Sequence, residues 1–215
     1  MFKENKYVAV KELVSQEIVQ IVSQYALINE MISFTGETDK GIDKAQVPGA
    51  HSKYADTLME SILIHLQPKL EYITGLTLHP TYSYFRVYRS GMELKPHIDR
   101  PSCEISTTVC FKYNYIDLQD SLVWPMYIRA NNQSIPIGLE PGDGIVYRGL
   151  DLTHWREPLT APDYSYHIQG FFHYVDANGP YADYQLDKRL FIGQPKTIEQ
   201  STPAVSTKNY ISTVN

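Results

Sequence analysis

Three residues of this chain have the types and the spacing of a metal site. His97 and Asp99 are separated by one residue, and His154 follows a turn-forming Pro-Gly-Asp-Gly sequence at 141–144. Two imidazoles and one carboxylate hold an iron ion on one face and leave the opposite coordination positions open. Alternate side chains of an extended strand point the same way, so His97 and Asp99 are expected to share a face. The sequence therefore predicts one Fe(II) site with open positions.

The elements that must position these residues are short strands preceded by helices. Apolar residues at helical spacing predict two amphipathic helices, at about 13–25 and 55–66, with Pro68 ending the second. From residue 76 on, β-rich runs punctuated by Pro and Gly predict strands at 76–89, 94–99, 105–113, 123–129, 134–137, 144–147, 153–157 and 164–175. This order predicts an α+β fold, a double-stranded β-helix (jelly-roll) barrel with the N-terminal helices packed on one sheet.

Composition predicts one domain in a soluble, cytoplasmic protein. A chain of 215 residues with 43% hydrophobic residues can bury one core, which we expect within residues 1–200 as a single domain. Residues 201–215 are rich in Thr and Ser and are expected to form a disordered tail. No apolar run is long enough to cross a bilayer, and the first residues lack the apolar stretch of a signal peptide.

Charge and cysteine content restrict the partners and the compartment. A net charge of -5 argues against general affinity for nucleic acid. Cys103 and Cys110 are expected to face opposite sides of one strand, so a disulfide between them is not expected. This fits a reducing compartment in which Fe(II) persists. The sequence leaves the oligomeric state open.

The segment around His97 resembles a known family. The sequence Tyr88-Arg89-Ser90-Gly91, followed by Leu94-Lys95-Pro96-His97-Ile98-Asp99, is similar to a Tyr-x-x-Gly-x-x-Tyr-x-Pro-His-x-Asp segment. That segment is typical of the prolyl 4-hydroxylase group of Fe(II)/2-oxoglutarate-dependent dioxygenases, although Leu94 stands where the pattern has its second Tyr. Residues 147–156 resemble the strand pair that carries the distal His in the same superfamily. The resemblance implies Fe(II) at His97, Asp99 and His154, with 2-oxoglutarate and O2 as cosubstrates.

Several functions are compatible with this resemblance. It implies a dioxygenase that hydroxylates a C–H bond, and the segment at 88–99 favours a peptidyl proline as substrate. Hydroxylases of free amino acids and other small molecules share the fold and the iron site, so the substrate is expected to be a peptide or a small molecule. A non-catalytic jelly-roll binding or assembly module with a vestigial metal site is the remaining alternative. Halogenation is disfavoured because related halogenases lack the carboxylate that Asp99 supplies.

The far carboxylate of 2-oxoglutarate needs a basic partner inside such a barrel. Prolyl hydroxylases place a Lys or Arg about ten residues after the distal His, but residues 158–186 of this chain contain neither. Arg156 lies two residues after His154 and would share its face on a strand. We therefore predict that Arg156, by its charge, and Tyr88, by its hydroxyl, hold this carboxylate. A rim position for Arg156 is one alternative, and three other residues are rival anchors: Arg86, Lys112 and His167.

Overall fold

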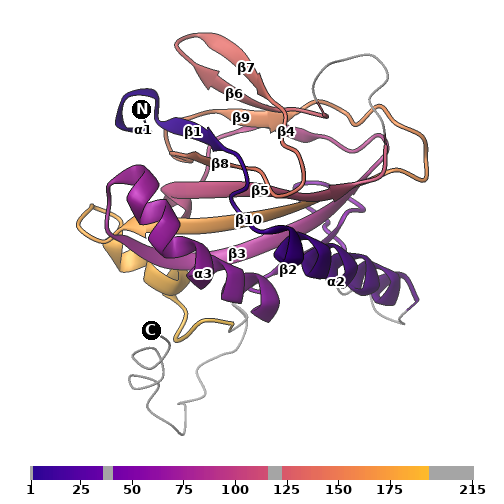
Figure 1. Cartoon of the computed structure of the whole chain (residues 1–215), viewed down its shortest axis with the longest axis horizontal. Coiled ribbons are helices and arrows are strands. Elements are labelled where there is room, and N and C mark those ends of the chain that lie inside the picture. The colour runs from indigo at the N-terminus through magenta and orange to yellow at the C-terminus, as the bar shows by residue number, and fades with distance from the viewer. Residues whose placement is uncertain (1, 36–40, 116–122, 194–215) are drawn as a thin grey trace, which may run out of the picture.

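Two antiparallel sheets face each other in the computed structural model, which describes residues 2–35, 41–115 and 123–193 (Figure 1). The larger sheet contains, in spatial order, β1 (Tyr7–Val10), β8 (Gly144–Tyr147), β5 (Ile105–Tyr113), β10 (Tyr166–Asp176), β3 (Leu78–Arg89) and β2 (His51–Tyr54). The smaller sheet contains β4 (Leu94–His97), β9 (His154–Arg156), β6 (Met126–Ala130) and β7 (Gln133–Ile137). This arrangement confirms the predicted α+β jelly-roll fold.

The helices cover the outer face of the larger sheet. Besides the short α1 (Phe2–Asn5), the chain forms α2 (Gln16–Thr35) and α3 (Thr57–Thr74), which lie on the side of that sheet away from the smaller one (Figure 1). Apolar side chains of both helices, such as Val22 and Leu63, join sheet residues such as Phe85 and Phe172 in the main core. The predicted packing of the N-terminal helices on one sheet is confirmed.

The second helix does not end where the sequence predicts. Asp56 caps its first turn, and the helix continues through Pro68 to Thr74, where Gly75 ends it with a left-handed φ of 69°. A proline inside a helix removes one N–H donor and leaves the carbonyl four residues earlier without its helical partner. That carbonyl belongs to Ile64, which is 40% exposed, so water can satisfy it. The prediction that Pro68 ends the helix is therefore wrong.

The predicted strands are found within a few residues of their expected bounds, with two differences. β1 and β2, each four residues long, were not expected, because so short a run carries no readable alternation. β4 ends at His97, so Asp99 follows the strand instead of belonging to it. The Asp99 N–H turns away from the β4 ladder and donates to the Gly149 carbonyl at 2.9 Å.

Two other expectations concern cysteines and termini. Cys110 lies on β5, but Cys103 lies in the short η1 helix (Pro101–Cys103), so the expectation that they share one strand is wrong; both are buried free thiols. In the described residues, no helix has the length and apolarity required to span a membrane. The expected tail at 201–215 lies outside the described residues.

Candidate metal centre and adjoining cavity

The smaller sheet and the loop that follows β4 bring the three predicted ligands together. His97 and His154 are directly opposite each other in the β4–β9 pair, with ring centroids 4.3 Å apart. Asp99 Oδ1 lies 3.8 Å from His97 Nε2 and 3.6 Å from His154 Nε2. The three ligand atoms all lie within 4.8 Å of one another, which suits coordination of a single ion.

Hydrogen bonds orient both imidazoles for metal binding. The Nδ1 atom of His97 lies 2.8 Å from the Lys95 carbonyl oxygen, and Nδ1 of His154 lies 2.9 Å from that of Leu152. A carbonyl oxygen only accepts, so each Nδ1 carries the hydrogen and each Nε2 keeps its lone pair for an ion. Burial lowers the pKa of His154, which also favours the neutral ring that binds metal.

Asp99 is oriented by a neighbouring hydroxyl. Ser106 Oγ donates to Asp99 Oδ2 at 2.8 Å and lies 2.9 Å from Nδ1 of the buried His173. This contact occupies one carboxylate oxygen and turns Oδ1 toward the two imidazoles. Such outer contacts fix the direction of a ligand and typically contribute about 10- to 100-fold to metal affinity.

Gly149 leaves the space that Asp99 occupies. A Cβ atom built on Gly149 would lie 2.2 Å from Asp99 Oδ2 and 2.5 Å from the Cys103 carbonyl oxygen. We expect Gly149→Ala to displace the Asp99 carboxylate and to weaken binding of a divalent metal about 10- to 100-fold, as measured by calorimetry. Gly179→Ala, at a turn outside the cavity, is the control. Unchanged metal affinity in Gly149→Ala would argue against Asp99 as a ligand.

Two buried histidines predict acid sensitivity of the fold. Burial lowers the pKa of His51 and of His173 to about 4, whereas an unfolded His titrates near 6.5. Below about pH 6.5 the unfolded chain therefore binds protons that the folded chain does not bind, and the free energy of unfolding decreases until about pH 4. We expect the Tm of the metal-free protein to fall between pH 7 and 5, and to fall less in His51→Gln. A Tm that is constant over this range would contradict the burial of neutral imidazoles.

A cavity of about 270 Å³ adjoins the three ligands, between the two sheets. Its walls carry three arginines, Arg86, Arg100 and Arg156, and four tyrosines, Tyr54, Tyr82, Tyr84 and Tyr147. Two of the arginines are paired with carboxylates: Arg86 NH2 lies 2.6 Å from Asp43 Oδ2, and Arg100 NH1 lies 2.5 Å from Asp187 Oδ1.

Arg156 is the arginine without such a partner. It is 2% exposed, and its guanidinium donates to the Trp124 carbonyl oxygen at 2.6 Å and to Gln169 Oε1 at 2.7 Å. Its Cζ also lies 4.5 Å from the centroid of a Trp124 ring. Among the described residues, no carboxylate lies within 4.0 Å of this guanidinium. Burial lowers its pKa, and the rim position considered above is wrong.

The rival anchors are occupied or lie elsewhere. Besides Asp43, Arg86 donates to Gln46 Oε1 at 2.8 Å and to the Tyr88 hydroxyl oxygen at 3.0 Å. Lys112 and His167 do not line the cavity. Burial, with a smaller effect of the Arg156 charge, lowers the pKa of His167 well below its ordinary value, so this ring is neutral.

Tyr88 lies close to the cavity without lining it. It is fully buried and packs edge-on against Trp124, with ring centroids 5.1 Å apart. Because its hydroxyl oxygen accepts from Arg86, its own hydrogen can be donated to another group.

Besides Ser106, sequence reasoning missed Gln46, a second side chain that contacts a predicted ligand. Gln46 Nε2 lies 3.3 Å from His97 Nε2, and its Oε1 accepts from Arg86. Asp43 holds the local turn by accepting backbone N–H bonds from Ala45 and Gln46 at 2.8 and 3.0 Å. A single glutamine in a polar loop carries no motif, so no sequence signal singles it out.

Comparison with known proteins supports the fold. No family model matches the sequence, and no curated protein matches it. A prolyl-4-hydroxylase from Pseudomonas putida is 10% identical, with a TM-score of 0.59 over 80% of this chain and 94% of that one. A prolyl hydroxylase from Trichoplax adhaerens, in complex with a peptide fragment of hypoxia inducible factor, is 12% identical, with a TM-score of 0.60 over 81% and 86%.

A third solved structure extends the comparison to a different ligand. EctD from S. alaskensis, with 2-oxoglutarate and 5-hydroxyectoine, is 12% identical, with a TM-score of 0.61 over 87% of this chain and 81% of that one. At such identities the likeness establishes the fold. The chain has the jelly-roll fold of Fe(II)/2-oxoglutarate oxygenases, including prolyl hydroxylases.

Proposed function

We propose that this chain is an Fe(II)- and 2-oxoglutarate-dependent dioxygenase that hydroxylates a substrate C–H bond. The observation that supports it best is a buried guanidinium without an anion, that of Arg156, in the cavity that His97, Asp99 and His154 also line. A buried charge without a counter-ion is costly, so this cavity favours an anion. A molecule that chelates a metal at one end and carries a carboxylate at the other satisfies both features, and 2-oxoglutarate is such a molecule.

The donor set fits Fe(II). Two neutral imidazoles with unprotonated Nε2 atoms and one carboxylate oxygen would hold the ion on one face, at His97, Asp99 and His154, and the ion would replace the Gln46 contact to His97 Nε2. When bound, Fe(II) and 2-oxoglutarate would activate O2 and supply the oxidant for hydroxylation, with succinate and CO2 as products. EctD, which shares the fold, was crystallised with 2-oxoglutarate and with Fe in separate structures.

The chain's own residues would orient the cosubstrate. Arg156 lies two residues after His154 on β9, so both side chains project into the same cavity. We propose that its guanidinium binds the far carboxylate and that the Tyr88 hydroxyl donates a second hydrogen bond to it. The ion pair with Asp43 keeps Arg86 from this role.

The substrate is a peptide residue or a compact small molecule. A cavity of about 270 Å³ has to hold both the cosubstrate and the reacting group, which limits what reaches the metal. A peptidyl proline fits this limit and agrees with the segment at 88–99, and a free amino acid is the alternative. Among the solved structures with this fold, one contains a peptide fragment and another contains a small molecule, 5-hydroxyectoine.

Succinate formation separates the enzyme from a binding module. We expect the protein with Fe(II) to convert 2-oxoglutarate to succinate under air, slowly without substrate and faster with proline-containing peptides or free amino acids. A chain that binds metal and 2-oxoglutarate yet forms no succinate with any candidate substrate would support the non-catalytic alternative.

A further inference from the structure

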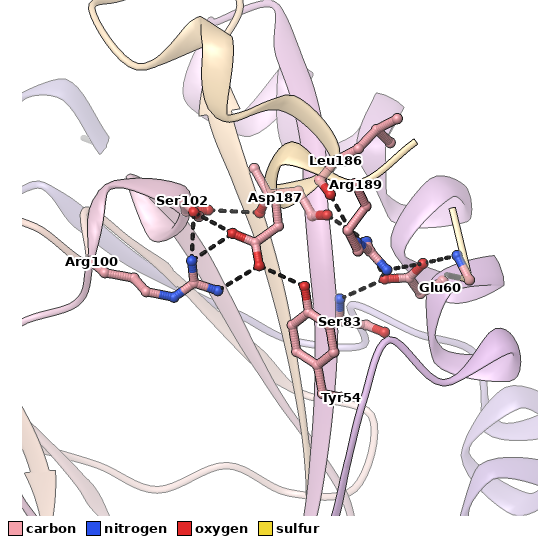
Figure 2. Close-up of polar contacts among 10 residues, drawn as sticks. Tyr54, Glu60, Ser83, Arg100, Ser102, Leu186, Asp187 and Arg189 are labelled. Atoms are coloured by element: carbon pink, nitrogen blue, oxygen red, sulfur yellow. Dashed lines mark hydrogen bonds and ion pairs between the residues drawn. The ribbon is translucent and has the colours of Figure 1, made fainter. Parts of the chain in front are cut away.

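The C-terminal part of the described chain packs against the loop after β4 that carries Asp99 and Arg100, here called the metal-binding loop. The η2 segment (Ala182–Lys188) carries Asp187, whose carboxylate accepts from Arg100 NH1 at 2.5 Å and NH2 at 2.8 Å (Figure 2). The same carboxylate accepts from the hydroxyls of Ser102 at 2.6 Å and Tyr54 at 2.5 Å. Arg100 directly follows Asp99, so this cluster fixes the side chain next to the predicted carboxylate ligand.

A second buried ion pair holds the same segment from its other side. Arg189 NH2 lies 2.8 Å from Glu60 Oε1 on α3 and donates to the Thr81 carbonyl oxygen at 2.7 Å (Figure 2). Neither Arg189 nor Glu60 lines the cavity. The segment is therefore attached at two points, of which only the Asp187 cluster touches the metal-binding loop.

The backbone between these two points is strained. Leu186, Asp187 and Lys188 have φ values of 57°, 54° and 61°, in the left-handed region that residues other than glycine rarely adopt. Consecutive residues persist in this conformation only where surrounding contacts determine it. The contacts that do so here are those of Asp187 and Arg189, and the turn delivers the Asp187 carboxylate to Arg100.

Arg100 carries a positive charge in the cavity that the predicted ligands line. Its side chain is 41% exposed, lies over the Tyr82 ring with Cζ 4.6 Å from the centroid, and lines the same cavity as Asp99. Arginine binds carboxylates strongly through paired N–H donors. Without Asp187, the neighbouring Asp99 would offer a carboxylate to the released guanidinium, and the positive charge near the ligand set would repel a cation.

We propose that Asp187 is a positioning residue that holds the Arg100 guanidinium away from Asp99 and so keeps the Asp99 carboxylate available to a divalent cation. This role rests on the metal site of the proposed function. It assigns the C-terminal segment a part in metal affinity, beyond its part in stability.

Titration of the full chain with Mn(II) alone, followed by calorimetry, tests this role without relying on turnover. We expect Asp187→Asn to raise the Kd for Mn(II) about tenfold or more, because the freed Arg100 competes for Asp99. Arg100→Gln alone should keep the wild-type Kd within about threefold, and adding it to Asp187→Asn should restore that Kd, since the competitor is gone. Both variants that carry Asp187→Asn should have a lower Tm.

Glu60→Gln is the matched control, because it breaks the other buried ion pair of the same segment. It should lower the Tm and leave the Kd for Mn(II) unchanged. A wild-type Kd in Asp187→Asn, a double variant as weak as Asp187→Asn, or a tenfold loss in Arg100→Gln would each overturn the proposal. If the wild-type protein fails to bind Mn(II), the metal site itself is overturned. If the wild type binds Mn(II) and one of the three variant results above is found, only the role of Asp187 is overturned.

Discussion

Replacing His154 by alanine should abolish tight binding of a divalent metal, with a loss of affinity greater than about 100-fold, since removal of a ligand exceeds the effect of an outer contact. His154 is buried and directly opposite His97, and its ring supplies one of the three ligand atoms that lie within 4.8 Å of one another. Calorimetric titration with Mn(II) measures the loss, and succinate formation should disappear with it. His65→Ala, an exposed histidine on α3, is the control.

His97→Ala and Asp99→Ala should behave in the same way, because each contributes one of the three ligand atoms. The variants are to be compared at equal helix content, so that a loss of affinity is separated from a loss of fold. Wild-type metal affinity and succinate formation in His154→Ala would show that the metal binds elsewhere.

Arg156→Ala should raise the concentration of 2-oxoglutarate required for half-saturation and leave metal affinity unchanged. Loss of a charge-assisted hydrogen bond to a buried anion costs about 2–4 kcal/mol, which corresponds to roughly 30- to 1,000-fold in affinity. Arg156→Lys retains the charge without the paired N–H groups that now contact Trp124 and Gln169, and should fall between wild type and Arg156→Ala. Saturation curves of succinate formation measure the effect.

The rival anchors supply the comparison for this prediction. Tyr88→Phe removes one neutral donor and should cost about tenfold or less. Lys112→Ala should have no effect, because its side chain neither lines the cavity nor hydrogen-bonds to a described residue that does, unlike Tyr88, whose hydroxyl accepts from Arg86. Arg86→Ala and His167→Ala should cost less than Arg156→Ala. If alanine at one of these rival positions weakens 2-oxoglutarate binding while Arg156→Ala does not, the far carboxylate binds to that rival residue and not to Arg156.

The candidate metal centre was predictable because its residues carry a local signal. His97 and Asp99 are separated by one residue and His154 follows a turn sequence, so residue type and spacing single out all three, although Asp99 lies just after β4 and not on it. The place of Arg156 in the cavity wall was predictable for the same reason, since it shares β9 with His154, whereas its role as anchor stays a prediction. Strand periodicity also gives the order of eight of the ten strands, whereas β1 and β2 are too short to show it.

What the sequence hides are partners far apart in the chain. The contacts of Ser106 with His173, and of Arg100 with Asp187, join residues that no spacing rule relates. Both depend on the register in which β5, β10 and η2 pack, which is fixed by the whole core. Pro68 shows the opposite case, where a strong local signal is overridden at a position whose freed carbonyl belongs to a partly exposed residue, Ile64.

Anaerobic addition of Fe(II) and 2-oxoglutarate to the protein, followed by visible absorption, tests most directly whether the three ligands and Arg156 form one site. A 2-oxo acid that chelates Fe(II) gives a charge-transfer band that neither component gives alone. We predict this band for the wild-type protein, no band for His154→Ala, and for Arg156→Ala the same band at about 30-fold or more higher 2-oxoglutarate. A wild-type protein that binds Fe(II) but develops no band at saturating 2-oxoglutarate would contradict the account.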